Sequence, residues 1–251
     1  MNRSARHTGS YYAATANEIT DYPPLRGDEV ADVCVIGAGF TGIATALSLA
    51  ERGYRVHVVE AKRVGWGASG RNGGQLIGGI SGETAIAKHH GRDVEELFGE
   101  LRWLGHDIVR ERVAKYGIQC DLKSCYVDVA IKKRHLRDFE HDHDRLHAAG
   151  FPHEVRMLSK DETREVTGTD RYLGALLNMG NGHLHPLNLC IGEARAAASL
   201  GVTISENSPV TNIVHGSRPR VETANGSVTA DFVVIAGNAY HLLERRLRGI
   251  M

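Results

Sequence analysis

Glycines gathered in one part of the chain give the first indication of chemistry. Thirteen of the 29 glycines lie between residues 37 and 91, and the first group, residues 37–42 (GAGFTG), has the spacing G-x-G-x-x-G. In that pattern Gly37 makes the tight turn, Gly39 lets the backbone approach a pyrophosphate, and Gly42 lets the following helix pack closely. Glu60, eighteen residues beyond Gly42, is placed to accept hydrogen bonds from ribose hydroxyls. The spacing predicts a dinucleotide other than NADP, whose 2′-phosphate an acid would repel; a purely structural glycine turn is the alternative.

A second glycine-rich segment, residues 65–75 (GWGASGRNGGQ), follows closely. So many glycines allow backbone amides to press against a flat or anionic ligand. Ser69, Arg71, Asn72 and Gln75 supply hydrogen-bond donors. Trp66 either forms a wall of the ligand site or has only a packing role. A nicotinamide dehydrogenase would normally begin a helix here, so the segment favours another dinucleotide. A flexible surface loop is the alternative interpretation.

A strand, a turn, a helix and a second strand must hold these residues. Residues 31–36 form a short apolar run typical of a strand covered on both faces. Residues 43–52 have helical spacing and end before Gly53, and residues 55–60 (RVHVVE) form a second strand. The pattern predicts one right-handed βαβ unit with parallel strands.

The rest of the chain predicts a mixture of helices and strands. Residues 1–27 are polar and indicate an extended arm, whereas residues 232–236 (FVVIA) indicate a buried strand. Ser159 opens a capping box before a short helix, and Asn225-Gly226 predicts a hairpin. His185 precedes another helix and either caps it or lies near an active-site cleft. Further elements are expected as helices over 92–116, about 132–149 and 186–200, and as a strand over 125–131.

Composition excludes several classes of protein. The 30 basic and 30 acidic side chains balance, so no general nucleic-acid footprint is expected. No stretch approaches 18 apolar residues, so we expect no membrane span. The four cysteines form no C-x-x-C pair and the start has no apolar signal segment, which favours the cytoplasm. The histidines of residues 141–147 indicate a solvated helix, and we expect no metal site.

The two motifs together resemble the FAD-dependent oxidoreductases of the D-amino-acid-oxidase family. The resemblance is carried by residues 32–61 and by GASGRNGGQ at residues 67–75. It extends through SYYAATAN near the start, RYLGALLNMGNGHLHPLNL at residues 171–189 and VVIAGNAY at residues 233–240. Within the family the chain is most similar to the gamma-glutamylputrescine oxidoreductase branch.

The resemblance implies FAD as the cofactor and assigns residues to it. The pyrophosphate would lie on the glycine turn, the adenosine ribose on Glu60, and the pyrophosphate and flavin along the second segment. Val210 corresponds to a position whose backbone meets the adenine, and residues 236–237 to a turn that crosses the cofactor. The candidate cofactor-binding residues are Gly37, Gly39, Phe40, Thr41, Gly42, Glu60, Ala61, Ser69, Arg71, Asn72, Gly73, Gly74, Gln75, Val210, Ala236 and Gly237.

The expected fold is α/β, with a Rossmann-like FAD-binding domain and an interrupted, incomplete α+β substrate domain. Residues 28–90 and 186–251 would form the FAD-binding domain and residues 91–185 the substrate-domain portion. Members of the family continue past the point that corresponds to Met251, so the chain resembles an amino-terminal part. We therefore expect it to bind FAD with little turnover unless the carboxy-terminal portion is supplied. The expected macromolecular partners are that portion or further copies of the chain in a homo-oligomer.

The implied function is oxidation of the C–N bond of an amine, of the gamma-glutamylputrescine type. Hydride would pass to the flavin, and oxygen would accept the electrons to give peroxide. The sequence identifies no general base, so no catalytic residue is assigned. The alternatives are a non-catalytic FAD-binding remnant and an NAD-dependent dehydrogenase.

Overall fold

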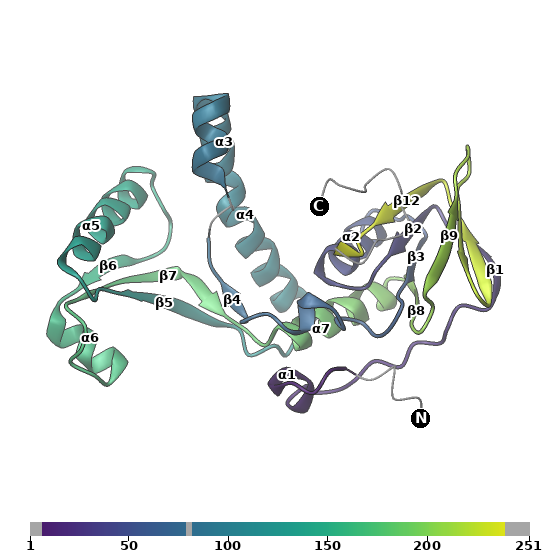
Figure 1. Ribbon diagram of the computed structural model, residues 1–251, viewed down its shortest axis with the longest axis horizontal. Helices are drawn as coiled ribbons and strands as arrows, with labels where there is room; N and C mark the ends of the chain where they lie inside the picture. The colour runs from purple at the N-terminus through teal and green to yellow at the C-terminus, as the bar shows by residue number, and fades with distance from the viewer. Residues whose placement is uncertain (1–6, 79–81, 239–251) are drawn as a thin grey trace. The chain divides into compact units, whose positions relative to one another are not determined.

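The computed structural model describes residues 7–78 and 82–238, and these form two compact units (Figure 1). Unit 1 combines the chain up to Gly73 with Arg112–Cys120 and the part that begins at His185. Unit 2 is built from Gly74–Glu111 and Asp121–Leu184. The expected boundaries differ from this division, because residues 74–90 belong to unit 2 and residues 112–120 to unit 1.

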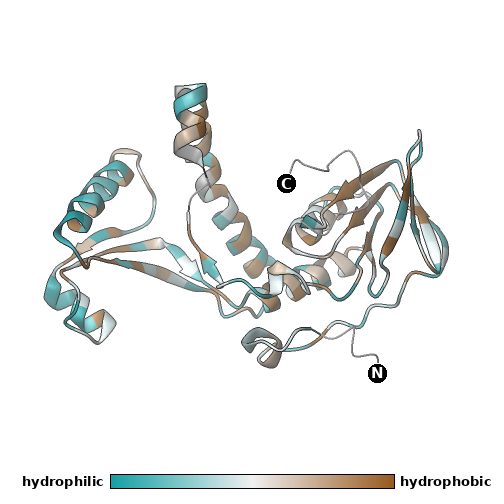
Figure 2. Cartoon of the chain, in the orientation of Figure 1, coloured by the Kyte–Doolittle hydropathy of each residue, from teal (hydrophilic) through white to brown (hydrophobic). Residues whose placement is uncertain are grey.

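A four-stranded parallel sheet lies at the centre of unit 1, in the order β12-β2-β3-β8. Its strands are β2 (Val33–Ile36), β3 (Val56–Val59), β8 (Thr203–Ser205) and β12 (Phe232–Ile235). The helix α2 (Phe40–Ala50) connects β2 to β3, which confirms the predicted βαβ unit. Hydrophobic residues are concentrated on these strands (Figure 2), as expected for a parallel sheet covered on both faces.

The helix α7 (Pro186–Ser199) packs against α2 and buries its apolar face in the same core. His185 caps this helix, because its Nδ1 accepts a hydrogen bond from the Asn188 backbone at 3.1 Å. The capping interpretation of His185 is therefore confirmed. The hydrophobic core of this layer includes Val35, Ile43, Leu47, Val58, Leu187 and Ile191, all buried.

A second sheet in unit 1 has the order β1-β11-β10-β9. β10 (Arg220–Thr223) and β11 (Gly226–Thr229) are antiparallel neighbours joined through Asn225, which confirms the predicted hairpin. β9 (Val210–Val214) pairs with β10, and β1 (Gly27–Val30) lies parallel to β11. This sheet shares with the parallel sheet a small core around Leu25, Val221 and Val228.

Unit 2 contains an antiparallel sheet in which the long strand β7 (Ala175–His183) pairs with three others. These are β4 (Gln75–Leu76), β5 (Lys123–Val129) and β6 (Val155–Leu158). The helices are α3 (Glu83–His90), α4 (Arg92–Tyr116, whose last residues belong to unit 1), α5 (Lys133–Ala148) and α6 (Lys160–Thr167). Ser159 and Glu162 form the predicted capping box at the start of α6.

Within the described part of residues 1–27, only the short helix α1 (Tyr11–Ala14) and the first residue of β1 are regular elements, and Leu25 is buried. The extended arm stays a prediction. One expectation about unit 1 is wrong: residues 232–236 were expected as a buried strand, but β12 lies at the edge of its sheet and Phe232 is 68% exposed. This outcome depends on which segments are neighbours in space, and local hydrophobicity carries no information about that.

Among the helices that the structure describes, none is both long enough and apolar enough to cross a membrane.

His57 in β3 gives unit 1 a predictable dependence on pH. Its side chain is 4% exposed, and burial holds the pKa of the imidazole below the usual 6.5. Below pH 6.5 the unfolded chain therefore takes up a proton that the folded chain does not, so the free energy of unfolding falls with acidification. We expect denaturant unfolding to show lower stability at pH 5.5 than at pH 7.5, with no contribution from His57 above its unfolded pKa.

Burial also lowers the pKa of His7, so His7 contributes to the same pH dependence. The variant His57→Asn removes only the contribution of His57 and thereby isolates it. The variant keeps a polar group near the Ser205 hydroxyl, which lies 2.9 Å from His57 Nε2. We expect the loss of stability between pH 7.5 and 5.5 to be smaller in the variant. An identical loss in both proteins would contradict the assignment.

Candidate cofactor site

A cavity of about 510 Å³ opens at the carboxyl ends of β2, β3 and β12. Its wall also includes the start of α2, the short 3-10 turn η2 (Ala68–Gly70) and the start of β9. In open parallel sheets, ligands bind in such a crevice outside the carboxyl ends of the strands. The candidate residues that line it are Gly37, Gly39, Phe40, Thr41, Glu60, Ala61, Ser69, Val210, Ala236 and Gly237.

The glycine positions of the turn leave no room for side chains. Gly37 has φ of +106°, and a Cβ there would lie 2.8 Å from the Ala236 carbonyl oxygen. A Cβ on Gly42 would lie 1.9 Å from the Gly37 carbonyl oxygen, so this glycine lies under the turn, where the helix meets the strand. The turn is also held by the Gly37 amide, which donates to Val59 at 2.9 Å. The backbone is thus shaped for close approach of a ligand.

The first turn of α2 faces an oxygen from the second glycine segment. The Phe40 amide donates to Ser69 Oγ at 2.9 Å, and a Cβ on Gly39 would lie 2.8 Å from the same oxygen. Gly39 itself provides no side-chain cap for the helix. The free amides and partial positive charge of a helix N-terminus favour anionic oxygens such as those of a pyrophosphate. The residues present therefore fit a dinucleotide.

Glu60 is held firmly at the edge of the cavity. One carboxylate oxygen accepts a hydrogen bond from the Ala38 amide at 2.7 Å, and the other accepts one from the Lys62 amide at 2.8 Å. The pKa of Glu60 is raised above its usual value, mainly by burial and also by the nearby Glu206 carboxylate. The two amide donors oppose this rise. A carboxylate has about four acceptor positions, so Glu60 keeps acceptor capacity for ribose hydroxyls.

Other candidate residues of the second glycine segment are engaged within it. The Arg71 guanidinium carbon lies 4.7 Å from the centre of the Trp66 ring, and Arg71 Nε donates to the Gly67 carbonyl at 3.1 Å. The Asn72 side chain donates to the Ser69 carbonyl at 2.9 Å. Within the described part of the chain, the cavity wall includes Trp66 but not Gly42, Arg71, Asn72 or Gly73.

Two further candidates belong to unit 2. The Gly74 carbonyl accepts a hydrogen bond from the Leu184 amide at 2.8 Å. Gln75 lies in β4, and its side chain donates to the Tyr126 hydroxyl at 3.1 Å. Gln75 therefore takes part in the antiparallel sheet of unit 2, and Gly74 lies directly before it.

The cavity wall also contains residues that the sequence did not indicate. Lys62 follows Glu60 on the same edge, and Pro209 and Ile213 flank the expected Val210. Proximity in the chain to Glu60 and Val210 is the only signal that could have found them. Ile213 lines the wall because β9 begins beside the parallel sheet, an arrangement that depends on long-range packing.

Taken together, the parallel sheet, the glycine turn and the acid at the end of the second strand define a dinucleotide-binding protein. Residues 32–250 match the family described as FAD dependent oxidoreductase (DAO). The chain therefore belongs to this family of FAD-dependent oxidoreductases, and FAD is the cofactor of the family.

Two curated relatives support this assignment at the level of sequence. Gamma-glutamylputrescine oxidoreductase from Escherichia coli (strain K12) is 43% identical over 235 residues, covering 93% of this chain and 55% of that protein. The probable oxidoreductase OrdL from Haemophilus influenzae is 41% identical over 236 residues, with the same coverage. The chain thus spans about half the length of the curated relatives it matches.

Solved structures show the same fold. Glycine oxidase from Geobacillus kaustophilus superposes with a TM-score of 0.65 at 26% identity, covering 83% of this chain and 55% of that one. L-amino acid deaminase from Proteus myxofaciens, solved in complex with anthranilate, gives a TM-score of 0.73 at 25% identity, covering 89% of this chain and 48% of that one.

Replacing Glu60 by alanine is expected to weaken FAD binding by about 1 to 3 kcal/mol, because charged hydrogen bonds to the ribose are lost. The Ala38 and Lys62 amides also lose their acceptor, so we expect a lower free energy of unfolding as well. FAD titration and urea unfolding measure the two effects separately. Wild-type FAD affinity in Glu60→Ala would show that Glu60 does not bind the ribose.

Proposed function

We propose that this protein oxidises the C–N bond of an amine or amino-acid-like substrate, of the gamma-glutamylputrescine type, with FAD held in the cavity of unit 1. The observation that carries the proposal is the cavity itself, where the glycine turn, the α2 N-terminus and Glu60 converge. The substrate class is supported by the relative of that name, which is 43% identical. Oxygen as the electron acceptor, with peroxide as the product, is part of the proposal.

The residues of this chain would bind and orient the cofactor. The pyrophosphate would lie against residues 37–42 and Ser69, and the ribose against Glu60. Residues 210 and 236–237 would meet the adenine and cross the cofactor. The chemistry that FAD would supply when bound is that of a hydride acceptor, for the hydride on the carbon next to the amine nitrogen. The polypeptide would position the substrate, exclude bulk water and favour the unprotonated amine.

The expected compartment is the cytoplasm. Cys34, Cys125 and Cys190 carry free thiols, which suits a compartment that keeps thiols reduced. Association into a homo-oligomer stays a prediction.

The visible absorption spectrum of the purified protein tests the proposal. We expect a yellow protein, or one that becomes so on adding FAD. Once a carboxy-terminal portion is also supplied, fused or in trans, anaerobic gamma-glutamylputrescine should bleach the flavin band. Admitting oxygen should restore the band and release peroxide. A protein without a flavin band that reduces NAD would support the dehydrogenase alternative. Flavin that binds but is bleached by no amine would support a non-catalytic flavin-binding protein.

A further inference from the structure

Glu206 is a fully buried carboxylate that the proposed reaction does not use. It accepts hydrogen bonds from the Val64 amide at 2.8 Å, the Tyr22 amide at 3.2 Å and the Arg63 guanidinium at 3.0 Å. The Thr20 hydroxyl donates to it as well. A buried charge is costly unless several donors face it, and here the donors come from two segments far apart in sequence.

One of these segments, residues 63–64, directly follows residues 60–62 at the edge of the cofactor cavity. Three backbone hydrogen bonds connect this edge to the residues around Glu206. The Glu60 amide donates to the Ser205 carbonyl at 2.8 Å, the Asn207 amide donates to the Lys62 carbonyl at 2.9 Å, and the Ser208 amide donates to the Glu60 carbonyl at 2.9 Å. The backbone on both sides of Glu206 is therefore bonded to residues 60–62, which line the cavity. Chain neighbours of Glu206 are thus bonded directly to Glu60, the residue proposed to bind the ribose.

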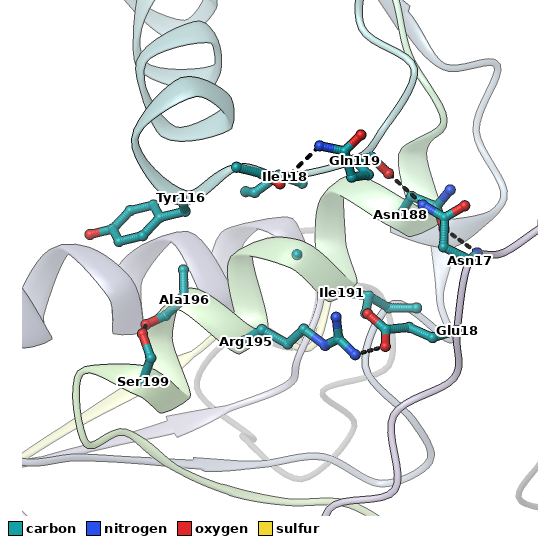
Figure 3. Close-up of a pocket in the computed structure, with 12 residues that line it drawn as sticks. Asn17, Glu18, Tyr116, Ile118, Gln119, Asn188, Ile191, Arg195, Ala196 and Ser199 are labelled. Atoms are coloured by element: carbon teal, nitrogen blue, oxygen red, sulfur yellow. Dashed lines mark hydrogen bonds and ion pairs between the residues drawn. The ribbon is translucent and has the colours of Figure 1, made fainter.

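The other segment is residues 15–25, which we call the N-terminal strap. At its start, the Asn17 amide donates to the Asn188 side chain at 3.0 Å, and Glu18 pairs with Arg195 on α7 beside an open cavity of about 710 Å³ (Figure 3). At its end, the Leu25 amide donates to Ser208 Oγ at 2.8 Å. Specific polar contacts thus hold the strap at both ends, and Glu206 holds its centre.

We infer that Glu206 is a positioning residue that couples the N-terminal strap to the cofactor cavity, so that docking of the strap and binding of FAD strengthen one another. The inference rests on the proposed FAD site. Its physical basis is that one carboxylate accepts hydrogen bonds from the strap and from residues 63–64, just after the cavity edge. Because coupling between two sites is reciprocal, loosening the strap weakens FAD binding, and FAD binding tightens the strap.

Thr20→Val tests the coupling from the strap side. The side chain is nearly isosteric, lies at a buried position, and loses only the hydroxyl that donates to Glu206. We expect its dissociation constant for FAD, measured by absorbance titration, to rise about fivefold, at the lower end of typical coupling. Asp21→Asn is the matched control, because the Asp21 side chain is 89% exposed and its pairing with Arg63 contributes little.

The rate of amide hydrogen exchange in residues 18–25, with and without FAD, distinguishes coupling from a purely structural role. If Glu206 only anchored the strap, FAD would not change this rate. In the wild-type protein FAD should slow exchange in this segment, including the Tyr22 and Leu25 amides. In Thr20→Val, with FAD at saturating concentration, the slowing should be largely lost. Glu206→Gln should show the same loss; if that variant does not fold, the Thr20→Val result stands alone as the test.

The outcomes separate this inference from the proposed function. Wild-type affinity in Thr20→Val, together with exchange of residues 18–25 that FAD leaves unchanged, would overturn the coupling while the FAD site stands. A wild-type protein that does not bind FAD at all would overturn both.

Discussion

Replacing Gly39 by valine is expected to abolish FAD binding while the chain remains folded. A Cβ at this position would lie 2.8 Å from Ser69 Oγ, and the two methyl groups would occupy the space beside the first amides of α2. The backbone itself is not strained by the change, because Gly39 has φ of −84° and ψ of −175°. We expect affinity to fall more than about 100-fold, because the pyrophosphate loses its close approach to the turn.

FAD titration, with circular dichroism to verify folding, measures this effect. Gly216→Val is the matched control, because a Cβ there meets nothing within 4 Å and Gly216 does not line the cofactor cavity. The control should bind FAD as the wild-type protein does. Unchanged affinity in folded Gly39→Val would show that the pyrophosphate does not lie on this turn.

Replacing Glu193 by alanine is expected to lower the free energy of unfolding by about 3 to 5 kcal/mol, the cost of leaving a buried charge without its partner. Glu193 on α7 pairs with Arg112 at 3.1 Å, and both side chains are buried. Arg112 also donates to the Ser48 hydroxyl at 2.6 Å, so the pair connects α7, α2 and the end of α4. Burial raises the pKa of Glu193, and the Arg112 guanidinium opposes that rise.

Urea unfolding checks this expectation, with Asp231→Ala as the control. Asp231 pairs with Arg218 at 3.1 Å, but about half of each side chain is exposed, so its loss should cost about 1 kcal/mol or less. The double variant Arg112→Met, Glu193→Leu should recover much of the lost stability, because apolar groups can replace a buried pair. Equal effects of Glu193→Ala and Asp231→Ala would contradict a special role for burial.

The features that the sequence predicted correctly are those coded by short-range spacing. The βαβ unit follows from two apolar runs on either side of a glycine turn, and the capping box at Ser159 involves residues three apart. The asparagine–glycine pair at residues 225–226 likewise specifies its hairpin locally. In each case the interacting residues lie within one or two elements, so their order in the chain determines their geometry.

Tertiary structure alone decided which donors face which acceptors across the chain. Arg71 and Asn72 have the chemistry to bind a ligand, yet their side chains bond within their own loop. Glu206 lies more than 140 residues from Arg63 and Val64, which it binds, and no periodicity connects these positions. The sequence by itself determined that this protein carries a dinucleotide-binding turn with an acid beside it. Folding decided which buried charges hold that turn in place, because their desolvation is offset only by partners that long-range packing brings to them.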